Sequence, residues 1–303
     1  MSNINKTANH LIVDWGTTNF RAFVMDAKSK MLDKKELPMG LLQVDDGDFA
    51  KALKSVLNGW IENFESLPIY MAGMVGSQLG WVNVEYASTS IDEAGLLKKA
   101  HRFDLPWGPQ AVIIPGVSHQ SETGAYDVMR GEEVQLFGLA KIVKQSSLDA
   151  ILPGTHSKHA NFVNGKMTRF ASFMTGELFS VISKYTILGK GLPEQVDSQV
   201  AFIRGVKEGQ LTNSLTSTLF AARTHRLFNN IEENEVLDYL SGLLIGNELK
   251  SLKNNHVFLV GGQSLCERYK IACTELSIFS TYISGDECFL AGMADLITVL
   301  NEG

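Results

Sequence analysis

DWGTTNFR at residues 14–21 and PGTHSK at residues 153–158 are two short Gly-Thr turns, and each follows a strand-like apolar run and precedes another predicted strand. A tight turn of this kind directs several backbone N–H groups at one point and adds side-chain hydroxyls, which makes an anion-binding nest. Asp14 ends an apolar run, so its carboxylate is suited to hold hydrated magnesium beside phosphates. Either turn alone fits an ordinary hairpin, whereas the pair predicts two loops that grip one polyphosphate.

The sequence around these turns is repeated. Superposing Gly16-Thr17 on Gly154-Thr155 aligns strand, turn and strand on both sides, which indicates two copies of one unit. Asn164-Gly165 is a hairpin signal inside the second copy. The two predicted three-strand meanders comprise residues 10–14, 20–26 and 30–36, and residues 149–152, 158–163 and 166–173.

Each meander is followed by a helical pattern and another buried strand that ends in glycines. The predicted helices are residues 48–64 and 235–252, and the predicted later strands are residues 68–76, 111–115, 256–262 and 277–283. Within the second helix, residues 240–249 with Gly242 and Gly246 favour close packing on the sheet. Residues 175–177 (TGE) fit ligand binding and helix capping equally well. The pattern predicts an α/β fold of two duplicated domains, residues 1–138 and 139–303.

Composition agrees with a compact two-domain enzyme, because 303 residues exceed what one core usually supports and 45% of them are hydrophobic. The net charge of −6, with both signs scattered, argues against a nucleic-acid surface. Polar residues 1–9 and the absence of an apolar run of about 18 residues predict no signal peptide, no membrane span and a cytoplasmic location. Cys266, Cys273 and Cys288 lack metal-ligand spacing, so reduced structural thiols are expected.

Several strings together carry a family resemblance. The two phosphate turns, the VGGQS turn at residues 260–264 and the duplicated sheet resemble the actin-like ATPase superfamily of sugar kinases, heat-shock chaperones and actin. Within it, the chain resembles the 2-dehydro-3-deoxygalactonokinase family from about residue 11 to residue 294. The strings that carry this closer resemblance are MAGMVGS at 71–77, VMRGEE at 128–133, LPGTHSK at 152–158 and MTGEL at 174–178. One departure is His159, where the family commonly has tryptophan.

The resemblance implies ribonuclease H-like domains with a central cleft, and phosphorylation of the 6-hydroxyl of 2-dehydro-3-deoxy-D-galactonate by ATP and Mg²⁺ in galactonate breakdown. Such transfer needs positioned phosphates, magnesium and a base for the hydroxyl proton. By similarity, Asp14 holds magnesium through water, and Arg21 reaches the transferred group. The residues assigned to the ATP phosphates are Gly16, Thr17, Thr18, Gly154, Thr155, Ser157 and Lys158, and those assigned to adenosine are Gly261, Gly262 and Gln263.

The string GEEVQLFG at residues 131–138 resembles the GDQQAALFG pattern of glycerol-kinase-type enzymes, in which the acid after the glycine is the general base. The alignment needs a one-residue gap, so Glu132 is the preferred base and Glu133 is the alternative. Acidic residues at a helix start also complement the helix macrodipole, and this capping interpretation stays open for both residues.

The substrate pocket is expected in the cleft between the two halves, over the ends of the first sheet. The glycine-rich turn that follows residues 70–72 is the counterpart of the adenosine turn, so the sugar acid is expected there. Gly76 and Ser77 offer N–H and hydroxyl donors, and Arg130 offers a cation for the substrate carboxylate. Glu133 is placed in the same pocket.

Two other functions stay open at this stage. One is phosphorylation of another sugar or sugar acid by the same superfamily, and the other is a non-catalytic, nucleotide-gated assembly protein. Gly131-Glu132 and a short chain without a peptide-binding appendage favour the kinase. The expected partners are small molecules, and the oligomeric state stays open, with a homodimer as one option.

Overall fold

The computed structural model describes residues 7–302 of the chain and divides it into two compact units. The first unit comprises Met1–Ser147, Phe162–Arg169 and Asp286–Gly303, and the second comprises Leu148–Asn161 and Phe170–Gly285. This division differs from the expected break after residue 138, because helix α4 (Glu132–Val143) runs across that position. Residues 1–6, most of the polar segment 1–9 for which no signal peptide is expected, lie outside the described part.

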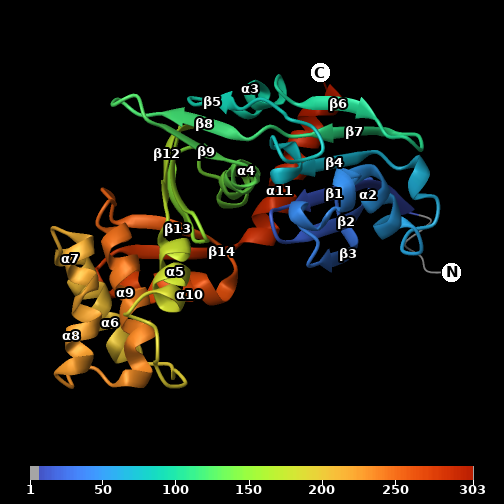
Figure 1. The fold of residues 1–303 in the computed structure, drawn as a ribbon. Helices are drawn as coiled ribbons and strands as arrows, with labels where there is room; N and C mark the ends of the chain where they lie inside the picture. The colour runs from blue at the N-terminus through green and yellow to red at the C-terminus, as the bar shows by residue number, and fades with distance from the viewer. Residues whose placement is uncertain (1–6, 303) are drawn as a thin grey trace. The chain divides into compact units, whose positions relative to one another are not determined.

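The main sheet of the first unit has the strand order β3-β2-β1-β4-β7-β6 (Figure 1). The first three strands form the predicted meander, with antiparallel pairing of β1 with β2 and of β2 with β3. Strand β4 then pairs parallel with β1, and β7 pairs parallel with β4. The bounds are β1 (Ala8–Trp15), β2 (Phe20–Asp26), β3 (Met31–Leu37), β4 (Ile69–Ala72), β6 (His101–Asp104) and β7 (Gln110–Ile113).

The second long sheet repeats this arrangement with the order β12-β11-β10-β13-β14. Strand β13 pairs parallel with β10, and β14 pairs parallel with β13, as β4 and β7 do in the first sheet. The expected α/β fold with a duplicated sheet is therefore confirmed. The bounds are β10 (Leu148–Leu152), β11 (Ser157–Val163), β12 (Lys166–Phe173), β13 (His256–Gly261) and β14 (Phe279–Ser284).

A third, smaller sheet in the first unit was not predicted and has the order β5-β8-β9. Its strands are β5 (Ala87–Ser88), β8 (Val117–Gln120) and β9 (Tyr126–Met129). Strand β9 leads directly through Arg130 and Gly131 into α4, so this sheet fixes where that helix begins.

Helix α2 (Phe49–Leu57) covers the first sheet and is shorter than the predicted helix 48–64. It begins at Asp48, whose side chain accepts a hydrogen bond from the Lys51 N–H at 2.9 Å, and it ends because Asn58 is extended and Gly59 has φ +82°. Its apolar face packs with Trp15 in the core of the unit. The other short helices of this unit are η1 (Leu41–Gln43), η2 (Asp45–Gly47), η3 (Phe64–Ser66), η4 (Met74–Gly76) and α3 (Glu93–Leu97).

The second unit is rich in helices, which gather beside β13 and β14 in Figure 1. They are α5 (Thr175–Tyr185), α6 (Gln199–Leu211), α7 (Leu215–Leu219), α8 (Ala221–Leu227), η5 (Glu233–Glu235), α9 (Val236–Leu249) and α10 (Gln263–Glu275). The C-terminal helix α11 (Gly285–Glu302) belongs to the first unit from Asp286 onward. Within residues 7–302, no helix is both long and apolar enough to span a membrane.

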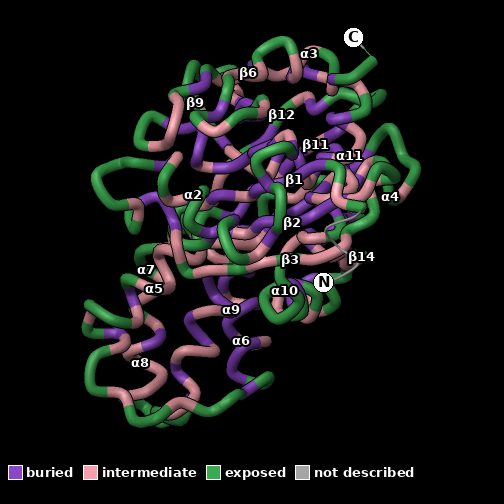
Figure 2. Tube along the Cα trace, turned by 90° about the vertical axis from the view of Figure 1, so that its right-hand side faces the viewer, coloured by how far each residue is buried: buried purple, intermediate pink, exposed green. Residues whose placement is uncertain are grey.

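Helices α6 and α9 are in backbone contact, and both carry buried residues (Figure 2). A Cβ atom built on Gly242 would lie 2.0 Å from the Phe202 carbonyl oxygen, and one on Gly205 would lie 2.1 Å from that of Tyr239. Gly246 and Gly209 make equally close approaches. The glycines of α9 therefore face α6 and not the sheet, contrary to the expectation from the sequence.

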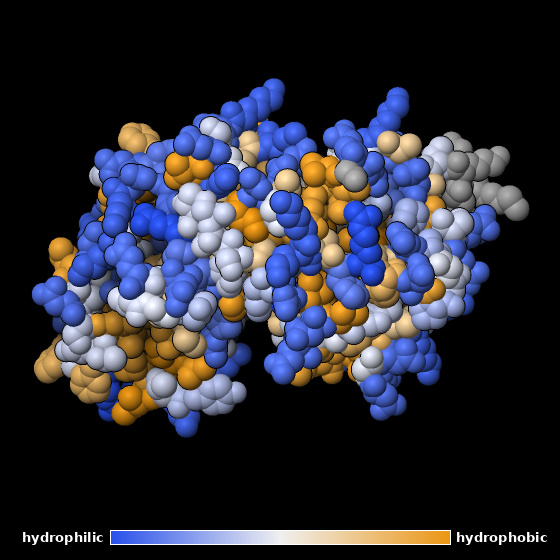
Figure 3. Space-filling view, turned by 90° about the horizontal axis from the view of Figure 1, so that it is seen from above, coloured by the Kyte–Doolittle hydropathy of each residue, from blue (hydrophilic) through white to orange (hydrophobic). Residues whose placement is uncertain are grey.

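The face shown in Figure 3 is mostly hydrophilic, with separate hydrophobic patches. This distribution matches a chain whose charges of both signs are spread along the sequence.

Candidate active site

The first Gly-Thr turn connects β1 to β2 and is closed by a 2.8 Å hydrogen bond from the Gly16 N–H to the Asn19 carbonyl oxygen. Thr17 and Thr18 are exposed at its tip, where their hydroxyls are available to a ligand. Gly40 lies against the back of the turn, and a Cβ there would be 1.9 Å from the Thr17 carbonyl oxygen. Position 40 therefore accepts only glycine, and the close backbone contact of Gly40 with Thr17 supports the turn.

Asp14 and Arg21 lie opposite each other at the ends of β1 and β2, and Arg21 also contacts Asp286. The Arg21 Nε donates to Asp14 Oδ2 at 3.1 Å, Nη2 donates to the same oxygen, and Nη1 donates to Asp286. Burial raises the pKa of Asp14, Arg21 opposes this shift, and the Asp286 carboxylate adds to it. Asp14, Arg21 and Asp286 line an open cavity of about 700 Å³ together with Gly16 and Thr18.

Asp286 was not predicted, although its sequence offers a signal. It follows Gly285 at the start of α11, in the same Gly-acid arrangement as Gly131-Glu132 at the start of α4. The chain separation of 265 residues from Arg21 hides the contact from sequence reasoning.

The glycine turn after β4 lies between Asp14 and the start of α4. A Cβ on Gly73 would be 3.0 Å from Asp14 Oδ1, and a Cβ on Gly131 would be 3.4 Å from the Gly73 Cα. Both glycines have positive φ, +93° and +101°, which other residues rarely adopt. The structure thus brings the Asp14 turn and the Glu132 segment close together within the first unit.

Glu132 and Glu133 have different surroundings at the start of α4. Glu133 is fully buried, and both of its carboxylate oxygens accept from the Gly131 N–H at 2.8 Å. Burial, followed by the neighbouring Glu132 charge, raises the pKa of Glu133 to about 8. Glu132 is partly exposed and accepts from the Arg130 N–H at 3.1 Å. Of the two carboxylates, only that of Glu132 is open to solvent.

Arg130 lies beside Gly76, which precedes Ser77 in the turn expected to bind the sugar acid. A Cβ on Gly76 would be 3.2 Å from Arg130 Nη1. The guanidinium lies over the Tyr86 ring, 4.0 Å from its centre, and Nη2 donates to the Val84 carbonyl oxygen at 2.5 Å. Tyr86 and Val84 had no signal in the sequence, because they reach Arg130 only through the fold.

This cluster also has unused hydrogen-bonding capacity. Arg130 Nε and Nη1 and the Ser77 hydroxyl are buried, and none has a hydrogen-bond partner within residues 7–302. Unpartnered buried donors are uncommon in folded proteins, and a bound ligand is one of the usual reasons for them.

In the second Gly-Thr turn, only some of the residues predicted to bind phosphate are exposed to solvent. Thr155 is exposed and Gly154 is partly exposed, whereas Ser157 is fully buried and Lys158 nearly so. The Ser157 hydroxyl donates inward to Glu248 at 2.7 Å, and Lys158 Nζ donates to the His156 carbonyl oxygen at 3.2 Å. The Ser157 hydroxyl is thus not available to a ligand, because a buried carboxylate already accepts its proton.

The start of α5 packs directly on this turn. A Cβ on Gly176 would lie 2.5 Å from the Gly154 carbonyl oxygen, and the Glu177 N–H donates to the Thr155 carbonyl oxygen at 3.0 Å. The His156 ring and the Glu177 carboxylate are hydrogen-bonded at 2.5 Å. Residues 175–177 therefore hold the second turn in position, whether or not they also touch a ligand.

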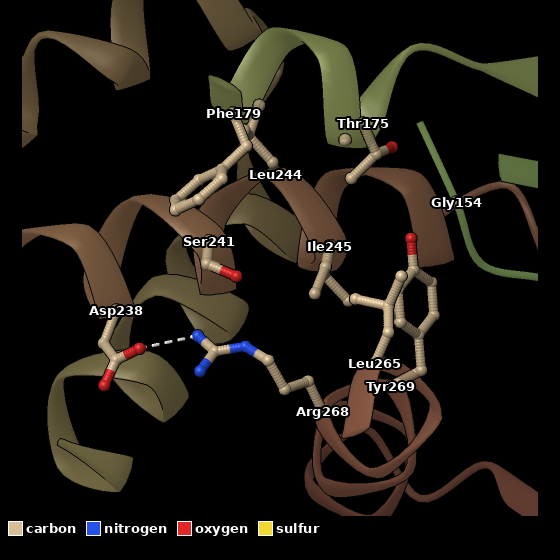
Figure 4. Close-up of a pocket in the computed structure, with 11 residues that line it drawn as sticks. Gly154, Thr175, Phe179, Asp238, Ser241, Leu244, Ile245, Leu265, Arg268 and Tyr269 are labelled. Atoms are coloured by element: carbon tan, nitrogen blue, oxygen red, sulfur yellow. Dashed lines mark hydrogen bonds and ion pairs between the residues drawn. The ribbon is translucent and has the colours of Figure 1, made fainter. Parts of the chain in front are cut away.

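A cavity of about 250 Å³ opens beside the second turn (Figure 4). One end is polar, where Arg268 donates to Asp238 at 2.7 Å (dashed in Figure 4) beside Ser241. Its lining residues are Gly154, Thr175, Gly176, Phe179, Asp238, Ser241, Leu244, Ile245, Leu265, Arg268 and Tyr269. A flat, largely apolar molecule with polar edges, such as a nucleobase, suits this lining.

The predicted adenosine turn leads into one wall of this cavity. Gly261 has φ +154°, Gly262 is exposed with no heavy atom within 4 Å of a built Cβ, and Gln263 is the exposed first residue of α10. Helix α10 then supplies Leu265, Arg268 and Tyr269 to the lining. The cavity residues of α9 were not predicted, although Asp238 and Ser241 are polar residues at one-turn spacing in the mostly apolar segment 236–246.

Two known proteins are similar to this chain over 96% of its length. A protein from Escherichia coli (strain K12) named 2-dehydro-3-deoxygalactonokinase is 33% identical over 297 residues, which cover 96% of this chain and 98% of that protein. A crystal structure from Sinorhizobium meliloti, named provisionally as a 2-dehydro-3-deoxygalactonokinase, superposes with a TM-score of 0.88 at 28% identity and covers 96% of this chain and 99% of that one.

The chain also matches the sequence profile of a whole protein family. The profile of the family described as 2-keto-3-deoxy-galactonokinase matches residues 14–296, a range that includes both Gly-Thr turns, the Glu132 segment and the Gly261-Gly262 turn. The chain therefore belongs to the 2-keto-3-deoxy-galactonokinase family.

Proposed function

We propose that this protein transfers the γ-phosphoryl group of ATP to the 6-hydroxyl of 2-dehydro-3-deoxy-D-galactonate, giving the 6-phosphate and ADP. Membership of the family and the name of the Escherichia coli relative support the reaction class. The observation that carries the choice of a sugar acid is the cluster of unpartnered buried donors on Arg130 and Ser77.

A carboxylate is the group that best satisfies this cluster. Two Arg130 nitrogens, Nε and Nη1, and the hydroxyl of Ser77, which follows Gly76 in the chain, are buried without a hydrogen-bond partner among residues 7–302. A charge-assisted hydrogen bond to a carboxylate is shorter and stronger than one between neutral groups. A substrate carboxylate would satisfy these N–H groups better than a neutral hydroxyl, which favours a sugar acid over a neutral sugar.

Glu132 is proposed as the general base, since it combines solvent access with a position near the Asp14 turn. It would accept the proton of the 6-hydroxyl as that oxygen forms its bond to phosphorus and ADP leaves. Glu133 is proposed as a buried support of the same turn, because its carboxylate is committed to the Gly131 N–H. Catalysis by such a site depends mostly on positioning and charge stabilisation.

Each Gly-Thr turn is proposed, taken by itself, as a phosphate-binding loop. In the first unit, Thr17 and Thr18 offer exposed hydroxyls, and in the second unit Gly154 and Thr155 offer an exposed turn. The cavity lined by Gly154 is proposed to hold the nucleoside, with Asp238 and Arg268 facing the polar edges of the base.

Magnesium is proposed to bind beside the first turn. Mg²⁺ in phosphotransfer sites takes one or two carboxylates together with water and phosphate oxygens, and the Asp14 and Asp286 carboxylates fit that donor set. The ion would neutralise phosphate charge, and Arg21 would then be free to pair with the transferred group.

A cytoplasmic location, which the sequence predicts, and a homodimer, which it leaves as one option, are also part of this proposal.

A coupled assay of ADP release tests the function, with Mg²⁺, ATP and a panel of sugar acids, their C4 epimers and neutral sugars. We expect fast ADP release with 2-dehydro-3-deoxy-D-galactonate and little release without an acceptor. Preference for another acceptor would favour a different sugar kinase. Slow ATP turnover that ignores every acceptor would favour a nucleotide-gated assembly protein. A Glu132→Gln preparation purified in parallel controls for contaminating kinases.

A further inference from the structure

Glu248, near the end of α9, is a buried carboxylate surrounded by hydrogen-bonding groups. It is 2% exposed. Oε1 accepts from the Ser157 hydroxyl at 2.7 Å and lies 2.8 Å from His159 Nε2, and Oε2 accepts from the Tyr269 hydroxyl at 2.7 Å and from the Thr175 hydroxyl. An ionised carboxylate only accepts hydrogen bonds, so these groups can all point at it without competition.

The partners of Glu248 come from separate parts of the second unit that surround the proposed nucleotide site. Ser157 ends the second Gly-Thr turn, and Thr175 begins α5, whose next residue packs on that turn. Tyr269 lies on α10 and lines the cavity beside Thr175 (Figure 4). Burial and the Glu248 charge raise the pKa of Tyr269 well above its usual value, so its hydroxyl stays protonated and donates.

We propose that Glu248 is a positioning residue for ATP, which joins the second phosphate turn, the start of α5 and the cavity wall of α10 into one preorganised site. This inference rests on the proposed function, since it assumes that ATP binds at this turn and cavity. Glu248 does not line the cavity and so acts through Ser157, Thr175 and Tyr269. Fixing the ligand-contacting groups before binding lowers the entropy cost of ordering them.

A second carboxylate in the same unit offers a matched control. Glu208 on α6 accepts from the Tyr239 hydroxyl and from Arg204, and it lies 3.2 Å from His225 Nε2. This Glu208 cluster has the same Glu-Tyr-His composition, but none of its members lines the cavity. A variant at Glu208 therefore reports the effect of breaking such a cluster where no nucleotide contact depends on it.

The test is titration calorimetry with Mg·ATP in the absence of sugar acid, on the unchanged full-length protein, Glu248→Gln and Glu208→Gln. The amide introduced by Glu248→Gln cannot accept all four hydrogen bonds, so we expect the Kd of that variant for Mg·ATP to rise at least about tenfold. We expect Glu208→Gln to stay within about twofold of the unchanged protein. In steady-state assays, KM for ATP should rise in Glu248→Gln while KM for the sugar acid stays the same.

If Glu248→Gln fails to fold, Tyr269→Phe and Tyr239→Phe decide the question, because each removes one hydroxyl from the corresponding cluster. A Kd rise of about threefold or more in Tyr269→Phe alone supports the inference. Equal Kd values in the paired variants, or equal rises in both, would overturn it. Failure of the unchanged protein to bind Mg·ATP would overturn the proposed function and this inference with it.

Discussion

The backbone N–H of Gly131 lies 2.8 Å from both carboxylate oxygens of Glu133. Glu133 therefore stabilises the turn that starts α4, while the adjacent Glu132 points its carboxylate at the Arg130 N–H and stays partly exposed. Two consecutive glutamates thus have separate environments, which sharpens the choice of general base that the sequence leaves open.

Glu132→Gln should lose about 10² to 10⁴ in turnover, the usual contribution of a positioned general base, because the amide cannot accept a proton. Its affinity for ATP should barely change, and its melting temperature should stay near that of the unchanged protein. Single-turnover phosphoryl transfer measures the chemical step directly.

Glu133→Gln, measured alongside, should retain most of the transfer rate, because the Glu133 side chain is buried and bonded to the Gly131 N–H. A slow Glu133→Gln beside a normal Glu132→Gln would transfer the base assignment to Glu133. Normal transfer in both would end the general-base assignment.

The stability of the protein should depend on pH through Glu133. Its pKa rises from 4.5 to about 8 on folding, so between these values the folded state holds a proton that the unfolded state has lost. The free energy of unfolding therefore falls as pH rises from about 4.5 to about 8. Denaturant unfolding of the unchanged protein and Glu133→Gln across this range measures the effect, and the slope should be shallower in the variant. Parallel pH profiles would contradict the predicted shift.

The local elements of this fold could be predicted because their signals are local. Apolar runs beside the two Gly-Thr turns and the Asn164-Gly165 turn predict the meanders, and the structure confirms them as β1–β3 and β10–β12. Gly73 and Gly131 also lie in the strings that carry the family resemblance. In the structure both have positive φ, a backbone conformation that favours glycine.

The contacts between distant segments could not be predicted. Ser157 belongs to a recognisable phosphate turn, yet its hydroxyl points to Glu248, 91 residues away, which no local pattern reveals. The pairing of Arg21 with Asp286 and the stacking of Arg130 on Tyr86 are of the same kind. Sequence patterns identify which residues can bind phosphate, and the fold decides which of their side chains remain available.

The glycines between α6 and α9 should tolerate no side chain. Gly242→Ala would place a Cβ about 2.0 Å from the Phe202 carbonyl oxygen, so the helices must separate. We expect a loss of about 1–3 kcal/mol in the free energy of unfolding, measured by denaturant titration. Val200→Ala, at an exposed position on α6, is the control and should change stability by less than about 0.5 kcal/mol. Equal stability in both variants would mean that the two helices are not packed this closely.

Asp14→Asn should lose most turnover at unchanged magnesium while the protein stays folded, because phosphate charge is then under-neutralised. Raising the magnesium concentration should recover part of the rate, which a steady-state titration of Mg²⁺ at saturating ATP would reveal. Circular dichroism spectra of both proteins control for folding, since Asp14 also pairs with Arg21. Near-normal turnover in the variant would remove Asp14 from the metal site.

Arg130→Ala should discriminate between a substrate anchor and a structural residue. If Arg130 binds the substrate carboxylate, its loss removes a charge-assisted hydrogen bond of roughly 1.5–3 kcal/mol, which is about ten- to a hundredfold in kcat/KM for the sugar acid. The neutral 3-deoxy sugar, which lacks the carboxylate, should be a poor substrate of the unchanged protein and should lose little more in the variant. Ser77→Ala is a milder companion that removes the other unpartnered donor and keeps the stacking of Arg130 on Tyr86. Equal losses for the acid and the neutral sugar in Arg130→Ala would show that the guanidinium supports the pocket through Val84 and Tyr86 and does not contact the substrate carboxylate.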